Sequence, residues 1–369
     1  MLSRTDTEHD VIHMRRALEL ASRGLGLAAP NPMVGAVVVA ADDVVGEGWH
    51  EGPGTVHAEV MALAAAGGRA HGATLYVTLE PCSHVGRTGP CAPAVAEAGI
   101  ARVVAAIRDP NPKVDGGGFA VLRSSGVEVE TGVLAREAED LIAGFAKHVM
   151  TGQPFVVLKL AASLDGKVAA PDGSSRWITG EEARRDGHRL RAASGAVIVG
   201  AGTAIADRPQ LTVRLDGYRG RQPVRVVVDS SGRTPAEGPL FDGSNPTVVA
   251  TTTTAQPGAV ERWRKRRVEV REFAGDRVPL RALLSDLGGA GIQSALIEGG
   301  PTLAAAALEE GVVDRLVVYL APKLIGGDAP GMFDALRIGT IGEARPLRIR
   351  TVERIGDDVK VVADVHRDR

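Results

Sequence analysis

The amino-acid sequence predicts an α/β protein with two domains. With 369 residues, the chain is longer than one typical hydrophobic core can organise. Helical and extended patterns alternate along most of its length, which is typical of a sheet covered by helices. The segment TGQP at positions 151–154 interrupts this alternation with Gly and Pro. We therefore predict one domain over residues 1–150 and a second over residues 151–369.

The first domain is predicted to contain a largely parallel sheet with helices on both faces, because strand and helix patterns alternate. Apolar positions at helical spacing indicate helices at 8–23, 57–66, 91–98, 118–126 and 136–150. Runs rich in Val, Ile and Thr indicate strands at 34–40, 43–50, 74–80, 102–107 and 127–133. A short polar turn joins the first two strands.

The second domain continues the alternation of strands and helices. Strands are predicted at 155–163, 196–200, 224–229, 247–251, 268–273, 294–300 and 315–324. Two further strands, expected to be antiparallel, share residues 347–365 around a GDD turn. Thr179 and Glu182 form a capping-box pattern that predicts a helix ending at Ala193. Pro301 is typical of a first helical position and predicts a helix to Glu309.

The composition argues against nucleic acid and membranes as partners. The formal net charge is −2 and aromatic residues make up 3% of the chain, so neither a basic field nor a base-stacking surface is expected. The N-terminal segment carries acids and bases throughout and lacks the apolar core of a signal peptide. No stretch approaches the roughly eighteen apolar residues of a membrane-spanning helix. We expect a cytoplasmic protein.

The only two cysteines of the chain, Cys82 and Cys91, lie in a loop rich in Gly and Pro. In a reducing compartment such a pair is more often metal-binding or catalytic than a disulfide. His57 opens a predicted helix, and Cys82 follows a Pro at the end of a strand. The three residues would hold Zn²⁺ and leave its fourth position for water, which is typical of catalytic zinc. Each residue alone is more often structural, so the prediction depends on their occurring together.

Glu59 stands two residues after His57. In the first turn of a helix, side chains lean back past the helix end, so both side chains can reach one pocket. Glu59 would accept a proton from the zinc-bound water and deliver one to a departing amine. His-x-Glu followed by Pro-Cys is the signature of zinc nucleoside and nucleobase deaminases. Here eight residues separate the two cysteines, where that signature has two.

Four segments of the first domain closely resemble the bifunctional deaminase-reductase family of riboflavin biosynthesis. They are APNPMVGAVVV (29–39), GEGWHEGPGTVHAEVMAL (46–63), TLYVTLEPCSHVGRTGPC (74–91) and RDPNPKVDGGG (108–118). The resemblance implies a cytidine-deaminase-like fold of three α/β/α layers. It also implies that Asn31, His50, His84 and the DPNP loop approach a pyrimidine or its ribose phosphate. Asn-Pro and Asp-Pro are also common turn formers, so these contacts have a purely structural alternative.

The second domain contains two Gly-rich turns after strands. Gly200 and Gly202 are similar to a Rossmann fingerprint, but Ile205 stands where that pattern requires Gly, so the match is weak. Gly300 precedes the helix that begins at Pro301, and free backbone N–H groups at such a helix start bind phosphate. An ordinary connection between a strand and a helix would look the same.

Further segments of the second domain resemble the pyrimidine reductase of the same pathway. They are LKLAASLDGKVA (158–169), SRWITG (175–180), RLRAASGAVIVGAGTAIADRPQLTVR (189–214) and VVVDSSGR (226–233). The resemblance implies a fold like that of dihydrofolate reductase and NADPH as hydride donor. It implies that the cofactor is lined by Ala161, Trp177, Thr203, Asp207, Ser230, Gly300, Pro301, Thr302, Leu303, Ala304, Ala305 and Ala306. It implies that the substrate is lined by Ser175, Arg191, Leu211, Arg214 and Glu298.

The charged residues of this set suit a phosphorylated substrate. Arg191 and Arg214 can hold a ribose phosphate through charge-assisted hydrogen bonds, although most Arg residues are solvated surface charges. Asp207 would orient the substrate or move a proton as the sugar ring opens; its alternative is a simple turn residue. Lys159 lies within an apolar strand, where an unpaired ammonium is costly. We therefore expect Lys159 to face the active site and contact substrate.

The sequence thus predicts two consecutive reactions on a phosphorylated pyrimidine. A zinc-dependent deamination would convert 2,5-diamino-6-(5-phosphoribosylamino)pyrimidin-4-one, and an NADPH-dependent reduction of the ribosyl group would give 5-amino-6-(5-phosphoribitylamino)uracil. The substrate identity comes wholly from the resemblance, as does the expectation of a homo-oligomer, a dimer or a tetramer. Two alternatives stay open: a nucleic-acid-acting zinc deaminase with an accessory domain, and a non-catalytic metal-binding or scaffold protein.

Overall fold

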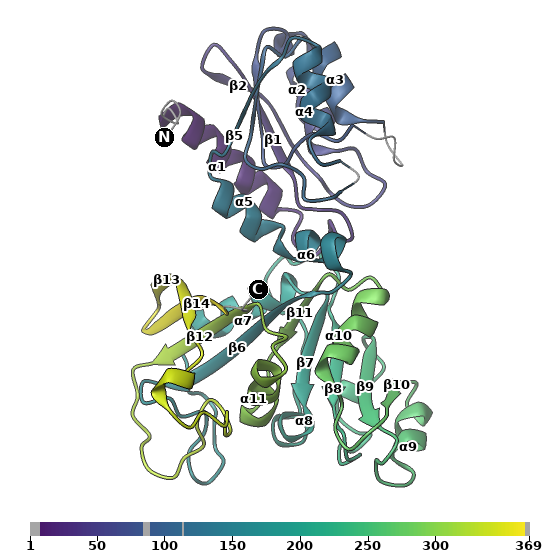
Figure 1. Cartoon of the computed structure of the whole chain (residues 1–369), viewed down its shortest axis with the longest axis vertical. Coiled ribbons are helices and arrows are strands. Elements are labelled where there is room, and N and C mark those ends of the chain that lie inside the picture. Colours follow the sequence, from purple (N-terminus) through teal and green to yellow (C-terminus); the bar gives the residue numbers. More distant parts are fainter. Residues whose placement is uncertain (1–7, 84–88, 113, 366–369) are drawn as a thin grey trace. The chain divides into compact units, whose positions relative to one another are not determined.

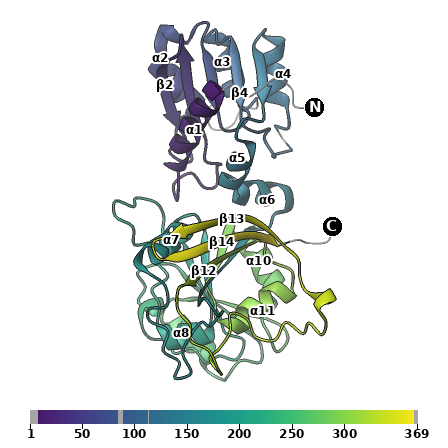
Figure 2. The same ribbon diagram turned by 90° about the vertical axis from the view of Figure 1, so that its left-hand side faces the viewer.

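The protein is described by a computed structural model over residues 8–83, 89–112 and 114–365. It divides into two compact units, residues 1–152 (unit 1) and residues 153–369 (unit 2), each with its own sheet. Figure 1 shows both sheets with their helices, and Figure 2 shows them from a second side. Among the described residues, no helix is long and apolar enough to cross a membrane.

Unit 1 contains a five-stranded sheet with the order β2-β1-β3-β4-β5. Its strands are β1 (Gly35–Ala40), β2 (Asp43–Trp49), β3 (Thr74–Val77), β4 (Arg102–Ala105) and β5 (Glu128–Thr131). β1 is antiparallel to both β2 and β3, whereas β3, β4 and β5 are parallel. The prediction of a largely parallel sheet was wrong here. Ala41 and Asp42 both adopt positive φ (47° and 71°) and form a tight hairpin turn between β1 and β2.

Helices cover both faces of this sheet, because successive strand residues point to opposite sides. Ala36 and Val38 of β1 pack with α2 (Ala58–Ala66), α3 (Cys91–Glu97) and α4 (Gly117–Ser124). Val37 and Val39 pack with α1 (Glu8–Ser22) and α5 (Ala135–Leu141) on the other face. Unit 1 also has a 3₁₀ turn, η1 (Gly67–Ala70). The predicted three-layer α/β/α arrangement is confirmed.

The helix predicted over 136–150 is two helices in the structure. α5 ends at Leu141 and α6 (Ala143–Thr151) follows. Ile142 between them is buried and leaves helical geometry, with φ −107° and ψ 14°. The helical pattern of residues 136–150 is continuous in the sequence, but the backbone of the buried Ile142 divides it into two helices.

Unit 2 contains a nine-stranded sheet with the order β10-β9-β8-β7-β11-β6-β12-β14-β13. Its strands are β6 (Phe155–Ser163), β7 (Ala196–Gly200), β8 (Val224–Val228), β9 (Thr247–Thr252), β10 (Glu269–Phe273), β11 (Ser294–Ile297), β12 (Arg315–Ala321), β13 (Leu347–Ile355) and β14 (Asp358–Val365). All pairings are parallel from β10 to β12, and the C-terminal hairpin of β13 and β14 is antiparallel, as predicted.

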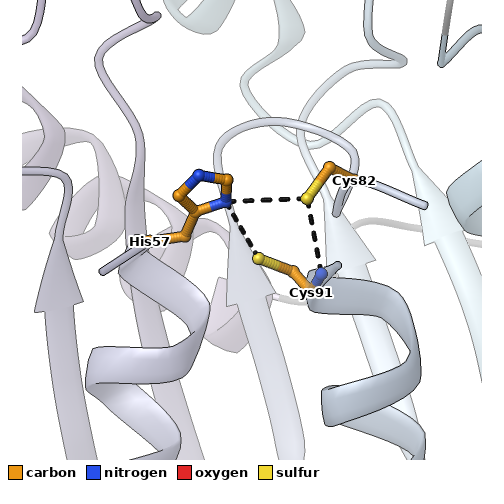
Figure 3. A group of neighbouring side chains, drawn as sticks. All are labelled: His57, Cys82 and Cys91. Atoms are coloured by element: carbon orange, nitrogen blue, oxygen red, sulfur yellow. Dashed lines mark hydrogen bonds between the residues drawn. The ribbon is translucent and has the colours of Figure 1, made fainter. Parts of the chain in front are cut away.

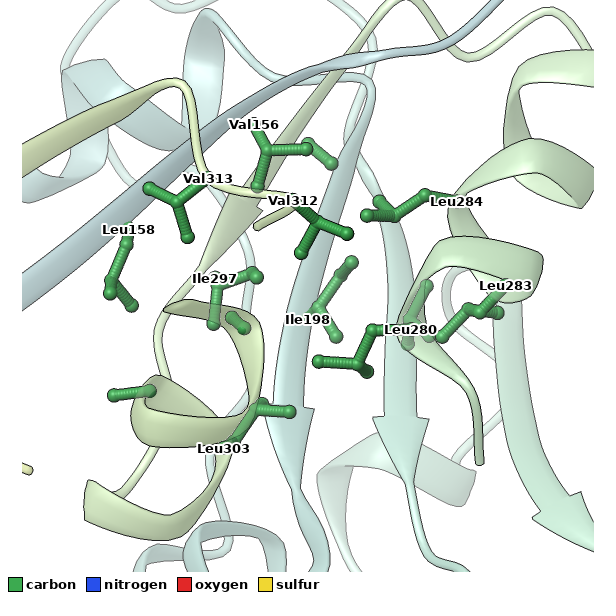
Figure 4. Close-up of a cluster of buried hydrophobic side chains, with 14 of the residues drawn as sticks. Val156, Leu158, Ile198, Leu280, Leu283, Leu284, Ile297, Leu303, Val312 and Val313 are labelled. Atoms are coloured by element: carbon green, nitrogen blue, oxygen red, sulfur yellow. The ribbon is translucent and has the colours of Figure 1, made fainter. Parts of the chain in front are cut away.

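Helices also cover both faces of the second sheet. They are α7 (Glu181–Ala192), α8 (Ala201–Asp207), α9 (Ala259–Lys265), α10 (Leu280–Gly289) and α11 (Pro301–Glu309), with 3₁₀ turns η2 (Pro239–Phe241) and η3 (Ile341–Glu343). Figure 4 shows one core, in which strand residues such as Ile198 and Ile297 pack against α10 and α11. On the other face Trp263 of α9 and Ala204 of α8 pack with Val197. Both faces of a largely parallel sheet are thus kept from water.

The capping box predicted at Thr179 and Glu182 is not formed. The residue that precedes α7 is Gly180, and no side chain of the segment caps the helix. Instead Asp358 of β14 accepts the backbone N–H of Gly180 through Oδ2 at 2.7 Å. A carboxylate distant in the sequence therefore accepts the N–H of the residue that precedes the helix, which is the role that a capping box gives to its Glu.

Candidate functional site

Three potential metal ligands converge in unit 1. His57 directly precedes α2, Cys82 lies beyond the end of β3, and Cys91 is the first residue of α3. His57 Nδ1 lies 3.1 Å from Cys91 Sγ and 3.6 Å from Cys82 Sγ, and the backbone N–H of Cys91 donates to Cys82 Sγ at 3.3 Å (Figure 3). All three ligand atoms lie within 4.8 Å of one another.

Close packing of α2 against β2 places His57 at this point. A Cβ atom built on Gly48 of β2 would lie 2.2 Å from the carbonyl oxygen of Ala58 and 2.7 Å from the backbone nitrogen of Ala62. Only Gly therefore lets the first turn of α2 rest directly on the strand. His57, one residue before that turn, is fixed by the same contact.

The geometry fits Zn²⁺. Tetrahedral zinc with one His nitrogen and two Cys sulfurs separates neighbouring nitrogen and sulfur ligands by about 3.5 Å, which agrees with the two His57 distances. The hydrogen bond from Cys91 lowers the pKa of the Cys82 thiol, and the same contact raises the pKa of Cys91. A cation between the two sulfurs would let both be thiolates. These residues can supply three protein ligands to a metal that keeps a fourth position for water.

Glu59 lies in the first turn of α2 and is 4% exposed. Burial raises the pKa of Glu59 to about 7. A carboxyl group whose pKa lies near neutrality can both accept and donate a proton. The structure thus places a suitable acid–base group beside the three ligands, where the sequence predicted it.

A cavity of about 400 Å³ opens on these residues, entirely within unit 1. It is lined by Pro30, Asn31, Pro32, Val34, His50, Pro53, Gly54, Thr55, His57, Ala58, Glu59, Leu79, Glu80, Cys82, Asp109, Asn111 and Phe145. The predicted residues Asn31 and His50 are in this lining, and so is the predicted DPNP loop. Phe145 and Thr55 were not predicted, because Phe145 lies in no motif and Thr55, although within the segment 46–63, was not singled out. His84, predicted to contact substrate, lies outside the described residues.

His50 is held in one tautomer. Its Nδ1 lies 3.3 Å from the carbonyl oxygen of Val56, so Nδ1 donates there. Nε2 is then the acceptor and receives the side-chain N–H of Asn31 at 2.9 Å. Burial lowers the pKa of His50, which keeps the ring neutral. Asn31 thereby uses its amide N–H₂ on His50 and keeps its carbonyl oxygen for another partner.

Unit 2 holds a cluster of charged side chains from three elements. Lys159 lies in β6, Arg191 in the last turn of α7, and Glu298 directly after β11. Arg191 Nε and Nη2 donate to the two oxygens of Glu298 at 2.6 and 2.8 Å. Burial alone would raise the pKa of Glu298, but the charges of Arg191 and Lys159 hold it below its usual range. Burial lowers the pKa of Lys159, which Glu298 partly offsets.

The other predicted substrate residues of unit 2 differ in their exposure. Arg214 is exposed and donates to Gln210 Oε1 at 2.7 Å, and Arg191 lowers its pKa in addition to burial. Leu211 is 2% exposed and packs in the core, so it presents almost no surface to a ligand. The carbonyl oxygen of Ser175 accepts the N–H of Ile178 at 3.1 Å.

His188 was missed by the sequence analysis. It stands one helical turn before Arg191, and its Nδ1 lies 3.1 Å from the carbonyl oxygen of Thr212 and 3.2 Å from the backbone nitrogen of Arg214. Burial and the positive charges of Arg191 and Arg214 lower the pKa of His188 to about 4. The only signal in the sequence was a His three positions from Arg191 on one helix face.

The predicted cofactor residues lie at strand ends and helix starts of unit 2. Thr203 of α8 is close to the start of α11, since a Cβ built on Gly300 would lie 3.4 Å from Thr203 Oγ1. Pro301 begins α11 as predicted, and Thr302 and Ala306 remain partly exposed. Leu303, Ala304 and Ala305 are buried, so the structure leaves little of these three residues open to a ligand.

The remaining cofactor candidates are more dispersed. Trp177 is 62% exposed, with the Arg184 guanidinium 4.7 Å from its ring centre. Asp207 is the last residue of α8, and its carbonyl oxygen accepts Arg176 Nη2 at 2.6 Å. Ser230 follows β8, and its hydroxyl accepts the N–H of Val278 at 2.9 Å. Ala161 lies on β6 opposite Tyr319 of β12.

Comparison with known proteins assigns both units. The family model described as the cytidine and deoxycytidylate deaminase zinc-binding region matches residues 7–107, and the RibD C-terminal domain matches residues 154–361. The riboflavin biosynthesis protein RibD of Escherichia coli is 44% identical over 95% of this chain and 98% of its own length. The chain belongs to the RibD family. RibD of Aquifex aeolicus, at 41% identity over 96% of this chain and 98% of its own, agrees.

Solved RibD structures share the whole architecture. Acinetobacter baumannii RibD superposes with a TM-score of 0.85 at 40% identity and covers 98% of this chain and 99% of its own. A deaminase/reductase of Thermotoga maritima gives 0.83 at 36% identity, with 97% and 99% covered. The predicted two-domain fold and family are confirmed. The chain is a deaminase and a reductase of riboflavin biosynthesis, with a zinc-binding deaminase domain and a reductase domain that implies a nicotinamide cofactor.

Proposed function

We propose that unit 1 deaminates 2,5-diamino-6-(5-phosphoribosylamino)pyrimidin-4(3H)-one and that unit 2 reduces the ribosyl group of the product to give 5-amino-6-(5-phosphoribitylamino)uracil. The Thermotoga relative is described as a diaminohydroxyphosphoribosylaminopyrimidine deaminase and 5-amino-6-(5-phosphoribosylamino)uracil reductase, which supports these substrates. The observation that carries the proposal is the convergence of His57, Cys82 and Cys91 beside the buried Glu59.

In the first reaction a water oxygen replaces the 2-amino group, which leaves as ammonia. A Zn²⁺ ion held by His57, Cys82 and Cys91 would acidify a water towards neutral pH. Glu59 accepts the proton of that water and then delivers a proton to the departing nitrogen. The Asn31 side chain, oriented by His50, offers its carbonyl oxygen to an N–H of the pyrimidine. Asn111 and Asp109 would line the same cavity around the substrate.

In the second reaction a hydride is added at C1′ of the ribosyl group, and the ring oxygen that leaves C1′ gains a proton. We propose NADPH as the hydride donor. Its phosphates would meet the backbone N–H groups at the start of α11, next to Thr203. Asp207 or Lys159 would supply or position the proton. The ribose phosphate would be held by Arg214 together with Arg191, whose guanidinium Glu298 already orients.

A two-part assay tests this proposal. The protein, loaded with zinc, is supplied with the diamino substrate with and without NADPH, and ammonia release and cofactor oxidation are followed separately. We expect ammonia without NADPH, and NADPH oxidation only after deamination. Glu59→Gln should lower ammonia release about a hundredfold or more and keep its zinc. Ammonia from tRNA and none from the pyrimidine would instead support the nucleic-acid-acting alternative, and full activity of Glu59→Gln would contradict the proposed proton transfer.

We also propose that the chain forms a homo-oligomer, a dimer or a tetramer. β13 is an edge strand of the second sheet, and it exposes Leu347, Ile349 and Val352. Exposed apolar edge strands are commonly covered by another chain, because their free backbone groups and apolar side chains favour pairing. Sedimentation of the purified protein should give a multiple of 38.4 kDa. A monomer at assay concentration would contradict this proposal.

A further inference from the structure

Glu80 lies on the wall of the zinc-site cavity but is bonded differently from Glu59. It is 3% exposed, and it stands directly before Pro81 and the ligand Cys82. Its Oε2 accepts the backbone N–H groups of Asp109 (3.2 Å) and Gly116 (3.1 Å). Its Oε1 accepts those of Gly118 (2.9 Å) and Phe119 (3.2 Å).

Four donors use the whole acceptor capacity of this carboxylate, which offers about four lone-pair positions. Glu80 therefore has no free acceptor position for substrate or water, whereas Glu59 receives no such set of backbone donors from the described residues. The two Glu side chains of this cavity thus have different roles. Glu80 binds the protein backbone, and its effect on a ligand must pass through the residues that it holds.

The backbone that Glu80 holds is the segment from Asp109 to Gly118, here called the 109–118 loop, together with Phe119. Its described residues are 109–112 and 114–118, and its last two residues begin α4. This loop supplies Asp109 and Asn111 to the cavity lining. At the C-terminal end of the loop, Gly118 packs so closely against Pro81 that no side chain would fit. A Cβ built on Gly118 would lie 1.9 Å from the carbonyl oxygen of Pro81. The Glu80 carboxylate and this contact together fix the loop to the segment that carries Cys82.

We infer that Glu80 is a positioning residue for the deamination, which holds the 109–118 loop in the form that binds the pyrimidine. The inference rests on the proposed deaminase function and adds a residue that acts on substrate binding. Hydrogen bonds from backbone N–H groups to a carboxylate are stronger than neutral ones. Replacing one oxygen by an amide N–H₂ would set its N–H donors against the two backbone N–H groups that this oxygen accepts, and would release that part of the loop.

The test compares Glu80→Gln with the wild-type chain at full length and with zinc bound. We expect the KM for the diamino substrate to rise about tenfold or more, because two charge-assisted hydrogen bonds are lost. The kcat of deamination should stay within about threefold, and the zinc content and reductase activity should match wild type. Glu80→Asp, which keeps the charge but not the reach, should give an intermediate KM. Glu97→Gln, an exposed Glu of α3, is the matched control and should change nothing.

Hydrogen exchange gives a readout that does not depend on substrate. In Glu80→Gln, the amides of residues 109, 116, 118 and 119 should exchange about tenfold faster or more, while the rest of unit 1 keeps its protection. An unchanged KM together with unchanged exchange would overturn the inference, as would loss of zinc or of kcat at constant KM. If Glu80→Gln does not fold, the same measurements on Glu80→Asp decide. Absence of ammonia release by the wild-type chain would instead count against the proposed function. The hydrogen-exchange result would still test whether Glu80 holds the loop, because it does not depend on substrate.

Discussion

The zinc-site residues of unit 1 are closer together in the sequence than the residues of the charge cluster of unit 2. His57 and Cys91 are 34 positions apart, and each lies at the start of a helix. Arg191 and Glu298 are 107 positions apart, on a helix and beyond a central strand. The first group presents donors that need a cation, whereas the second already balances a carboxylate against two cations.

This difference explains which group depends on a ligand. Two thiols and an imidazole within 4.8 Å of one another share their protons unequally, and a metal ion would relieve that competition. Arg191 and Glu298 form an ion pair within the protein, and the charge of Lys159 adds to that of Arg191 in lowering the pKa of Glu298. Unit 1 should therefore respond to metal removal and unit 2 to the loss of one charge.

The largest effect is expected from removing a metal ligand. Cys91→Ala should lower deaminase activity about a thousandfold or more, because only two protein ligands remain and the metal is lost. Reductase activity should stay near the wild-type value, since it belongs to the other unit. Metal analysis of the purified protein, followed by separate assays of the two activities, checks this. A variant that kept one zinc per chain and its deaminase activity would contradict the dependence of unit 1 on these three ligands.

The next effect concerns Glu298. Glu298→Gln leaves Arg191 and Lys159 as neighbouring buried cations, and the free energy of unfolding of unit 2 should fall by about 3 kcal/mol. Reductase activity should fall with it, while deaminase activity serves as the internal control. Urea unfolding followed by fluorescence measures the change. Wild-type stability of Glu298→Gln would show that the cluster is not balanced in the way its geometry indicates.

The third prediction concerns the pH dependence of stability in unit 2. His188 has a pKa of about 4 in the folded chain, because burial and then the charges of Arg191 and Arg214 disfavour its protonation. The pKa of an unfolded His is about 6.5. The unfolded chain therefore binds more protons between these values, and stability that is present above about pH 6.5 is lost as the pH falls towards 4. His188→Asn should flatten this part of the stability curve. A wild-type curve that is already flat over this range would refute the assignment to His188.

The smallest effect concerns the start of α7. Asp358→Ala removes the acceptor of the Gly180 N–H and should cost about 1 kcal/mol of stability. Thr179→Val is the matched control and should change stability by less than about 0.5 kcal/mol, because Thr179 does not cap the helix. Thermal unfolding of both variants measures the pair. A larger loss of stability in Thr179→Val than in Asp358→Ala would support the capping box that the sequence indicated.

Most strands and the two longest helices, α1 and α7, could be predicted from sequence, because their patterns depend on near neighbours. The strand order and three helices, α8, α9 and α10, could not. α8 begins directly after Gly200 and has seven residues, too few for an apolar period to be recognised. The direction of β1 relative to β3 depends on long-range pairing, which the composition of either strand does not encode.

The sequence by itself determined the metal-ligand candidates, the acid–base candidate beside them and the family. These depend on residue type and spacing, which the chain carries directly. The tertiary structure alone decided that Asp358 caps α7, that Glu298 pairs with Arg191, and that Glu80 binds the 109–118 loop. Each of these is a contact between charged or polar groups distant in the chain. The partner of such a group is fixed by which elements pack together, and no local pattern records it.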